Sequence, residues 1–225
     1  DTTESRGLGD VYKRQIKPED LANIGSFFKT GIFSPKRTVA VSGDSLKSPK
    51  YFDTVIGSSI SSLVDSKEFS NTEDYRFING DPLSGSKVQY SDFIGFYNNT
   101  LSVIKEGNHF RMLGWLPFMY NSVPSFSKTS FSWLLGGEKK VNTNLNGEER
   151  AIVVTGEMEK YFPMDIFPMQ LIKACMRGDI EKMESLGIYE VVPEDFGLVD
   201  FSCTSKIEAQ EIVKSGIQIM LKEVG

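Results

Sequence analysis

The sequence predicts an α+β protein with a small β-grasp domain, an irregular β connection and a C-terminal helical domain. Short alternating apolar runs separated by turn residues in 37–88 indicate strands around one short helix. Residues 89–150 carry a hairpin pattern and then aromatic residues broken by proline. From residue 151 to 225 the apolar residues keep helical spacing. These three patterns define the predicted domains.

Composition supports a packed core and excludes several classes of protein. The chain has 225 residues, of which 40% are hydrophobic and 24% charged, with a net charge of -5. It contains no basic cluster of the kind that neutralises nucleic-acid phosphates. No apolar run approaches the ~20 residues that span a bilayer. Two cysteines do not form a disulfide framework, which favours a reducing cytosol.

The first 36 residues divide into a leader and a helix. Residues 1–15 lack any sustained periodicity and resemble a translated sequencing adaptor, so we expect the native frame to begin near Ile16, with an upstream part missing. Residues 17–30 are predicted to form a helix, because Pro18 suits its first position and Gly31 its end. This helix needs a partner for its apolar stripe, which consists of Leu21, Ile24, Phe27 and Phe28.

The β-grasp prediction rests on strands at 37–42, 51–56 and 75–79, with a short helix after Gly57. The loop 80–86 contains glycines and hydroxyls but neither a Walker lysine nor a complete dinucleotide fingerprint. A plain turn is therefore the simpler interpretation than a phosphate cradle.

The connection at 89–150 is predicted to begin with a hairpin of residues 100–104 and 110–116. The lone His109 beside this turn lacks the neighbours that a metal site needs, so a solvated histidine is expected. A long loop follows, with Trp115 and Trp133 as candidates for a partner interface or for a cover over the core. Short strands are expected at 139–143 and 151–155.

The helical domain is predicted to contain a helix from Pro168 to Gly178, one at 179–186, and a last helix. The last helix is expected to begin at the capping-box pattern Ser205-Lys-Ile-Glu208. Cys175 falls within an apolar helical set, so it is predicted to be a small core residue rather than a reactive thiol.

Residues 149–203 follow the spacing of two bacterial ferredoxin half-motifs without their cysteines. Each half-motif is C-x2-C-x2-C-x3-C-P, which wraps four thiolates around an iron–sulfur cube. Alignment of the motif proline on Pro163 gives the first set of ligand positions, which is Ile152, Thr155, Met158 and Phe162. Alignment of the last ligand on Cys203 gives the second set, which is Pro193, Phe196, Val199 and Cys203. Seven of these eight residues cannot bind iron.

No self-contained catalytic site is visible in the sequence. A single histidine excludes a Ser/His/Asp set, and neither C-x-x-C nor H-E-x-x-H occurs. The carboxylates between residues 148 and 159 are interpreted as a solvated face.

An ordered series of motifs carries a resemblance to a known family. The strings SPKRTVAVSGD and VIGSSISSL resemble the soluble-ligand-binding β-grasp (SLBB) domain of respiratory subunits. They are followed in order by SVIKEG, LGWL, NGEERA, FPMDIFP and GDIEKMESLG. Together these motifs resemble the second half of the A subunit of the bacterial Na⁺-translocating NADH:quinone reductase.

This resemblance implies a peripheral protein at the cytoplasmic face of the bacterial inner membrane, in contact with the membrane-embedded B subunit of the complex. Residues 16–36 would be the tail of a Rossmann-like domain. The complex takes electrons from NADH to ubiquinone and exports sodium, whereas this portion would act as a scaffold associated with quinone and bind no cofactor itself. Two alternatives stay open: an electron carrier of the Rnf type, and a free-standing β-grasp module that binds a small ligand.

Overall fold

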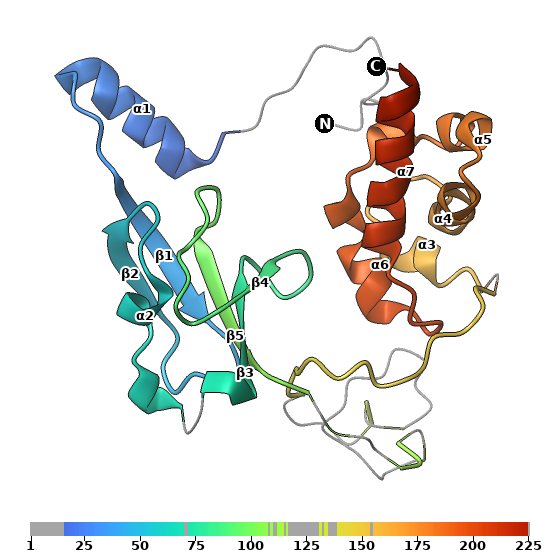
Figure 1. Ribbon diagram of the computed structural model, residues 1–225, viewed down its shortest axis with the longest axis horizontal. Helices are drawn as coiled ribbons and strands as arrows, with labels where there is room; N and C mark the ends of the chain where they lie inside the picture. Colours follow the sequence, from blue (N-terminus) through green and yellow to red (C-terminus); the bar gives the residue numbers. More distant parts are fainter. Residues whose placement is uncertain are drawn as a thin grey trace. The chain divides into compact units, whose positions relative to one another are not determined.

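The computed structural model describes residues 16–69, 72–107, 109, 112–114, 116, 131, 133–134, 139–153 and 155–224 (Figure 1). The predicted leader, 1–15, lies outside the described residues. The chain divides into two compact units. We call the part within residues 13–144 the sheet unit and the part within residues 145–225 the helical unit. Each is described by itself.

The sheet unit begins with helix α1, Pro18–Thr30. Pro18 occupies its first turn, and Gly31 ends it in the left-handed conformation with a φ of 71°. The first turn is attached to the sheet by side chains: Glu19 accepts a hydrogen bond from the Thr38 backbone N–H at 2.8 Å. Asp20 pairs with the Arg37 guanidinium at 2.7 Å. The predicted helix is confirmed.

Five strands form one mixed sheet in the order β2-β1-β5-β3-β4. They are β1 (Lys36–Ser42), β2 (Lys50–Val55), β3 (Tyr75–Asn79), β4 (Ser86–Val88) and β5 (Thr100–Lys105). Only the pair β1·β5 is parallel among these neighbours. Helix α2, Ile60–Leu63, and the short 3₁₀ turns η1 (Ser66–Glu68) and η2 (Thr72–Asp74) lie between β2 and β3.

The core of this unit follows from strand alternation. Val39 and Val41 of β1 point to the buried side, as do Leu101 and Val103 of the neighbouring β5. Ile60 of α2 is fully buried against the same cluster. The α+β class and a mixed sheet consistent with an SLBB domain are therefore confirmed.

The structure corrects three strand predictions. Strand β5 pairs with β1 on one edge and with β3 on the other, so neither edge is free for the predicted hairpin partner at 110–116. Within that range, residues 112–114 form a turn, and residues 110, 111 and 115 lie outside the described residues. The predicted strand at 139–143 is reduced to one isolated bridge between Asn142 and Lys105. Among the described residues of 151–155 no strand forms. Strand β4 was not predicted.

The helical unit consists of short helices. They are α3 (Met158–Tyr161), α4 (Pro168–Arg177), α5 (Ile180–Ser185), α6 (Gly197–Ser202) and α7 (Ala209–Val224), with 3₁₀ turns η3 (Ile188–Glu190) and η4 (Pro193–Phe196). Helices α4 and α7 pack together (Figure 1). The predicted helices at 168–178 and 179–186 are confirmed, whereas α3, α6 and the two turns were not predicted.

The cap of α7 differs from the predicted one. The Asp200 carboxylate on α6 accepts hydrogen bonds from the backbone N–H groups of Ala209 at 2.5 Å and Gln210 at 3.3 Å. Ser205 instead donates its hydroxyl to the Ala151 carbonyl at 3.1 Å. The capping-box prediction is wrong, because the helix starts later and a residue from another helix supplies the acceptor.

Candidate functional site

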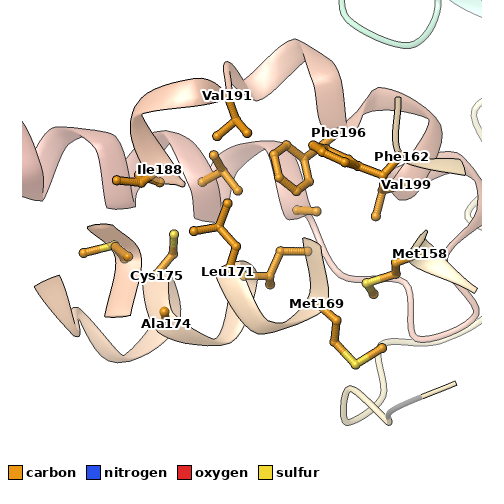
Figure 2. Close-up of a cluster of buried hydrophobic side chains, with 14 of the residues drawn as sticks. Met158, Phe162, Met169, Leu171, Ala174, Cys175, Ile188, Val191, Phe196 and Val199 are labelled. Atoms are coloured by element: carbon orange, nitrogen blue, oxygen red, sulfur yellow. The ribbon is translucent and has the colours of Figure 1, made fainter. Parts of the chain in front are cut away.

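Five of the eight ligand positions predicted from the half-motifs lie in the core of the helical unit. Met158, Phe162, Phe196, Val199 and Cys203 all belong to one buried cluster. Figure 2 shows Phe162, Phe196 and Val199 close together, with Met158 nearby. Residues more than thirty positions apart in the chain therefore pack in one core.

In a protein with two clusters, the fourth cysteine of each half-motif binds the cluster of the other half. By that rule, Phe162 belongs with Pro193, Phe196 and Val199. The rings of Phe162 and Phe196 are 4.7 Å apart, and Phe196 and Val199 are fully buried. Aromatic and branched side chains thus fill the space at these positions, and Pro193 opens the turn η4.

By the same rule, Cys203 belongs with the first set, and the structure brings most of that set around one small hollow. Thr155, Met158 and Cys203 all line it. Its remaining lining residues are Val153, Glu157, Ser202, Thr204 and Ser205. Ile152 does not line the hollow and packs against the buried cluster. The hollow therefore has one thiol, several hydroxyls and one carboxylate around it.

Lys206 adds a charged group that the spacing analysis did not identify. It has a left-handed backbone with a φ of 52°. Desolvation lowers the pKa of its ammonium group, and the nearby Cys203 acts in the opposite direction. The only sequence signal for Lys206 was its position three residues after Cys203, and that position did not indicate the direction of its side chain.

The other sequence-predicted residues have simpler environments. Cys175 is buried, and burial raises the pKa of its thiol to about 11, so the predicted role as a core residue is supported. His109 is exposed, and its backbone N–H donates to Asn144. Among the described residues, no group of three or more His, Cys, Asp or Glu side chains is arranged to hold a metal ion.

Of the two tryptophan candidates, Trp133 is half exposed and Trp115 lies outside the described residues. The interface role of both therefore stays a prediction. Within the part of the chain that the structure describes, no helix has the length and apolar character needed to cross a membrane.

Together, the fold defines an α+β protein with an SLBB-like sheet and a helical unit. Comparison with known proteins adds the family. Residues 38–90 match a family model described as the NQRA C-terminal domain. The A subunit of the Na(+)-translocating NADH-quinone reductase of Neisseria meningitidis is 32% identical over 213 residues, which are 92% of this chain and 46% of the relative.

Two further relatives with the same name agree. The protein of Pasteurella multocida is 33% identical over 214 residues, 92% of this chain and 46% of its own. The protein of Rhodopirellula baltica is 32% identical over 212 residues, which are 91% of this chain and 45% of the relative. The resemblance drawn from the sequence is confirmed, and the chain is a relative of the A subunit of this oxidoreductase complex. It spans about half the length of the curated relatives it matches.

Proposed function

We propose that this chain is part of a Na⁺-translocating NADH:quinone reductase and serves there as a structural, redox-inactive portion of the A subunit. One observation carries the second half of the proposal. Most positions spaced for iron–sulfur ligands are occupied by residues that belong to a hydrophobic core or pack against it.

The chemistry of the two sets supports this role. A [4Fe–4S] cluster needs four ligands, normally thiolates. The set around Phe162 and Phe196 offers aromatic rings and no thiol. The set around the hollow offers only Cys203. We infer that the helical unit has a ferredoxin-type arrangement in which side chains replace the clusters, and that it binds no cofactor of its own.

The names of the relatives imply further subunits of the same complex. Sodium translocation requires a membrane-embedded protein, so we propose that the chain sits at the cytoplasmic face of the inner membrane against the integral B subunit. Trp115 and Trp133 are the residues we assign to that contact. The Trp133 side chain is 51% exposed. NADH and ubiquinone are then substrates of the complex rather than ligands of this portion.

Co-expression with the membrane-embedded B subunit of a sodium-pumping reductase tests the assignment. We expect residues 16–225 to be retained on the tagged B subunit, and the variant Trp133→Ser to be retained less. Phe93→Ser, which alters another exposed aromatic side chain, is the matched control and should bind normally. Absence of capture by a folded chain would refute the proposed docking.

The redox-inactive role has a separate test. Protein purified anaerobically should contain neither iron nor acid-labile sulfide in stoichiometric amounts. Stoichiometric iron and sulfide would instead support the electron-carrier alternative.

A further inference from the structure

Helix α1 presents an apolar face that no part of the described chain buries. None of its residues is buried, although it carries four large apolar side chains at helical spacing. Leu21 is 59% exposed, Ile24 43%, Phe27 45% and Phe28 83%. Large apolar side chains gathered on one face of a helix normally pack against another surface.

The helix is nevertheless held in a defined place by polar contacts at its first turn. The two Glu19 carboxylate oxygens accept from the Thr38 backbone N–H and from the Asn99 side-chain amide, each at 2.8 Å. Asp20 pairs with Arg37, a residue that is only 4% exposed. A helix of 13 residues is marginal by itself in water. These contacts orient α1 while they leave its apolar face uncovered.

The composition of the face indicates the kind of surface that would cover it. Residues 21–28 contain no charged side chain. Neither phosphate headgroups nor a strongly charged protein surface would find a complementary group there. An apolar protein surface would be complementary to this face, because burial of Leu, Ile and Phe side chains drives such association.

We propose that the apolar face of α1 is the docking surface for the part of the longer relatives that lies outside the match. The matched residues make up less than half of each of those relatives. The family model at 38–90 is described as a C-terminal domain, which puts the unmatched part ahead of it, where α1 also lies. This docking rests on the family relationship and does not depend on the redox-inactive role or on the B subunit.

The test compares one substitution in two contexts. The first is the present chain, and the second is a fusion in which the unmatched part of the Neisseria meningitidis relative precedes residue 16. We expect Phe28→Ser to lower the unfolding temperature of the fusion by about 4 °C and to leave that of the present chain unchanged. Serine and phenylalanine have similar helix propensities, so helix formation itself is little affected. Phe93→Ser, at a 64% exposed position of the same unit, should be neutral in both contexts.

Hydroxyl-radical footprinting supplies a second readout. Oxidation of Phe27 and Phe28 should fall several-fold in the fusion relative to the present chain, while oxidation of Phe93 stays the same. Equal oxidation of Phe27 and Phe28 in the present chain and in a folded fusion overturns the proposal.

Three results from the present chain alone would also overturn it. A loss of stability on Phe28→Ser would mean that the face is already covered within the chain. A dimer that dissociates on Phe28→Ser would assign the face to a second copy. Binding to phosphatidylglycerol vesicles that Phe28→Ser abolishes would assign it to a lipid surface. Each of these outcomes leaves capture by the B subunit and iron content as independent tests of the proposed function.

Discussion

The close contact between the two main helices of the helical unit gives a quantitative prediction. Gly216 of α7 faces Cys175 of α4, and a Cβ atom at Gly216 would be 2.5 Å from the Cys175 sulfur. It would also be 3.0 Å from the Cys175 Cβ atom and 3.2 Å from the Met183 sulfur. Non-bonded carbon atoms are normally separated by about 3.5–4.0 Å. We therefore expect Gly216→Ala to force these helices apart.

The magnitude follows from two opposing effects. Replacement of glycine by alanine inside a helix is normally worth about 1 kcal/mol of added stability. Insertion of an extra methyl group into a packed core costs about 1–3 kcal/mol, and the 2.5 Å approach places this site at the upper end. The net effect is a loss of about 1–2 kcal/mol in the free energy of unfolding. For a domain of this size each kilocalorie corresponds to about 4–8 °C in unfolding temperature.

Urea or thermal denaturation followed by circular dichroism measures this loss, and a double-mutant cycle assigns its cause. Cys175→Ala removes the sulfur that the new methyl group meets first, so Gly216→Ala should cost at least about 1 kcal/mol less in that background. Gly25→Ala in α1 is the control, because a Cβ atom there meets nothing within 4 Å. A neutral or stabilising Gly216→Ala, or the same loss in both backgrounds, would refute the packing explanation.

Three further predictions concern capping, pH dependence and the ligand positions. Asp200→Ala should cost about 1–2 kcal/mol in urea unfolding, because the first N–H groups of α7 lose their acceptor, and Asp200→Asn should restore most of it. The hydrogen bond from Arg76 lowers the pKa of Glu106 below its ordinary value of 4.5, so this pair's contribution to stability is present above that pH and is lost as the pH falls. Glu106→Gln should therefore weaken the sheet unit near neutral pH and flatten the acid limb of its stability profile. Cysteines at the other three positions of the first ligand set would complete its four thiolates, so anaerobic reconstitution should then yield about four irons per chain, and serine in place of Cys203 should prevent it. The substituted positions are Ile152, Thr155 and Met158.

The sequence correctly predicted the helices and strands whose boundaries or buried faces are marked by their own residues. Helix α1 begins with Pro18 and ends at Gly31, and α4 begins with Pro168 and ends at Gly178, so each carries both of its boundaries in its own sequence. The β1 strand likewise shows its buried face through alternation. In these elements the local preference and the final packing agree.

Two of the wrong predictions concern which partner a strand or a helix end takes. The turn residues after β5 looked like a hairpin, yet the strand is central and its partners are β1 and β3. Ser205 fits a capping box, yet Asp200 caps α7 from the preceding helix. Periodicity and turn chemistry describe neighbours along the chain, so they cannot indicate which of two available partners a strand or helix end will take.

At the candidate site, too, the sequence pattern and the packing of side chains give different information. Five of the eight residues that the ligand spacing selects lie in one buried core, and the ferredoxin-type arrangement itself stays a prediction. The spacing did not indicate how these side chains would pack. Phe162 and Phe196 pack against each other in the core, whereas Thr155, Met158 and Cys203 line a small hollow. In the proposed function the aromatic set is structural, and cysteines at its positions would remove side chains from the core. The set around the hollow retains one native thiol, so restored ligands can be tested there with three substitutions rather than four.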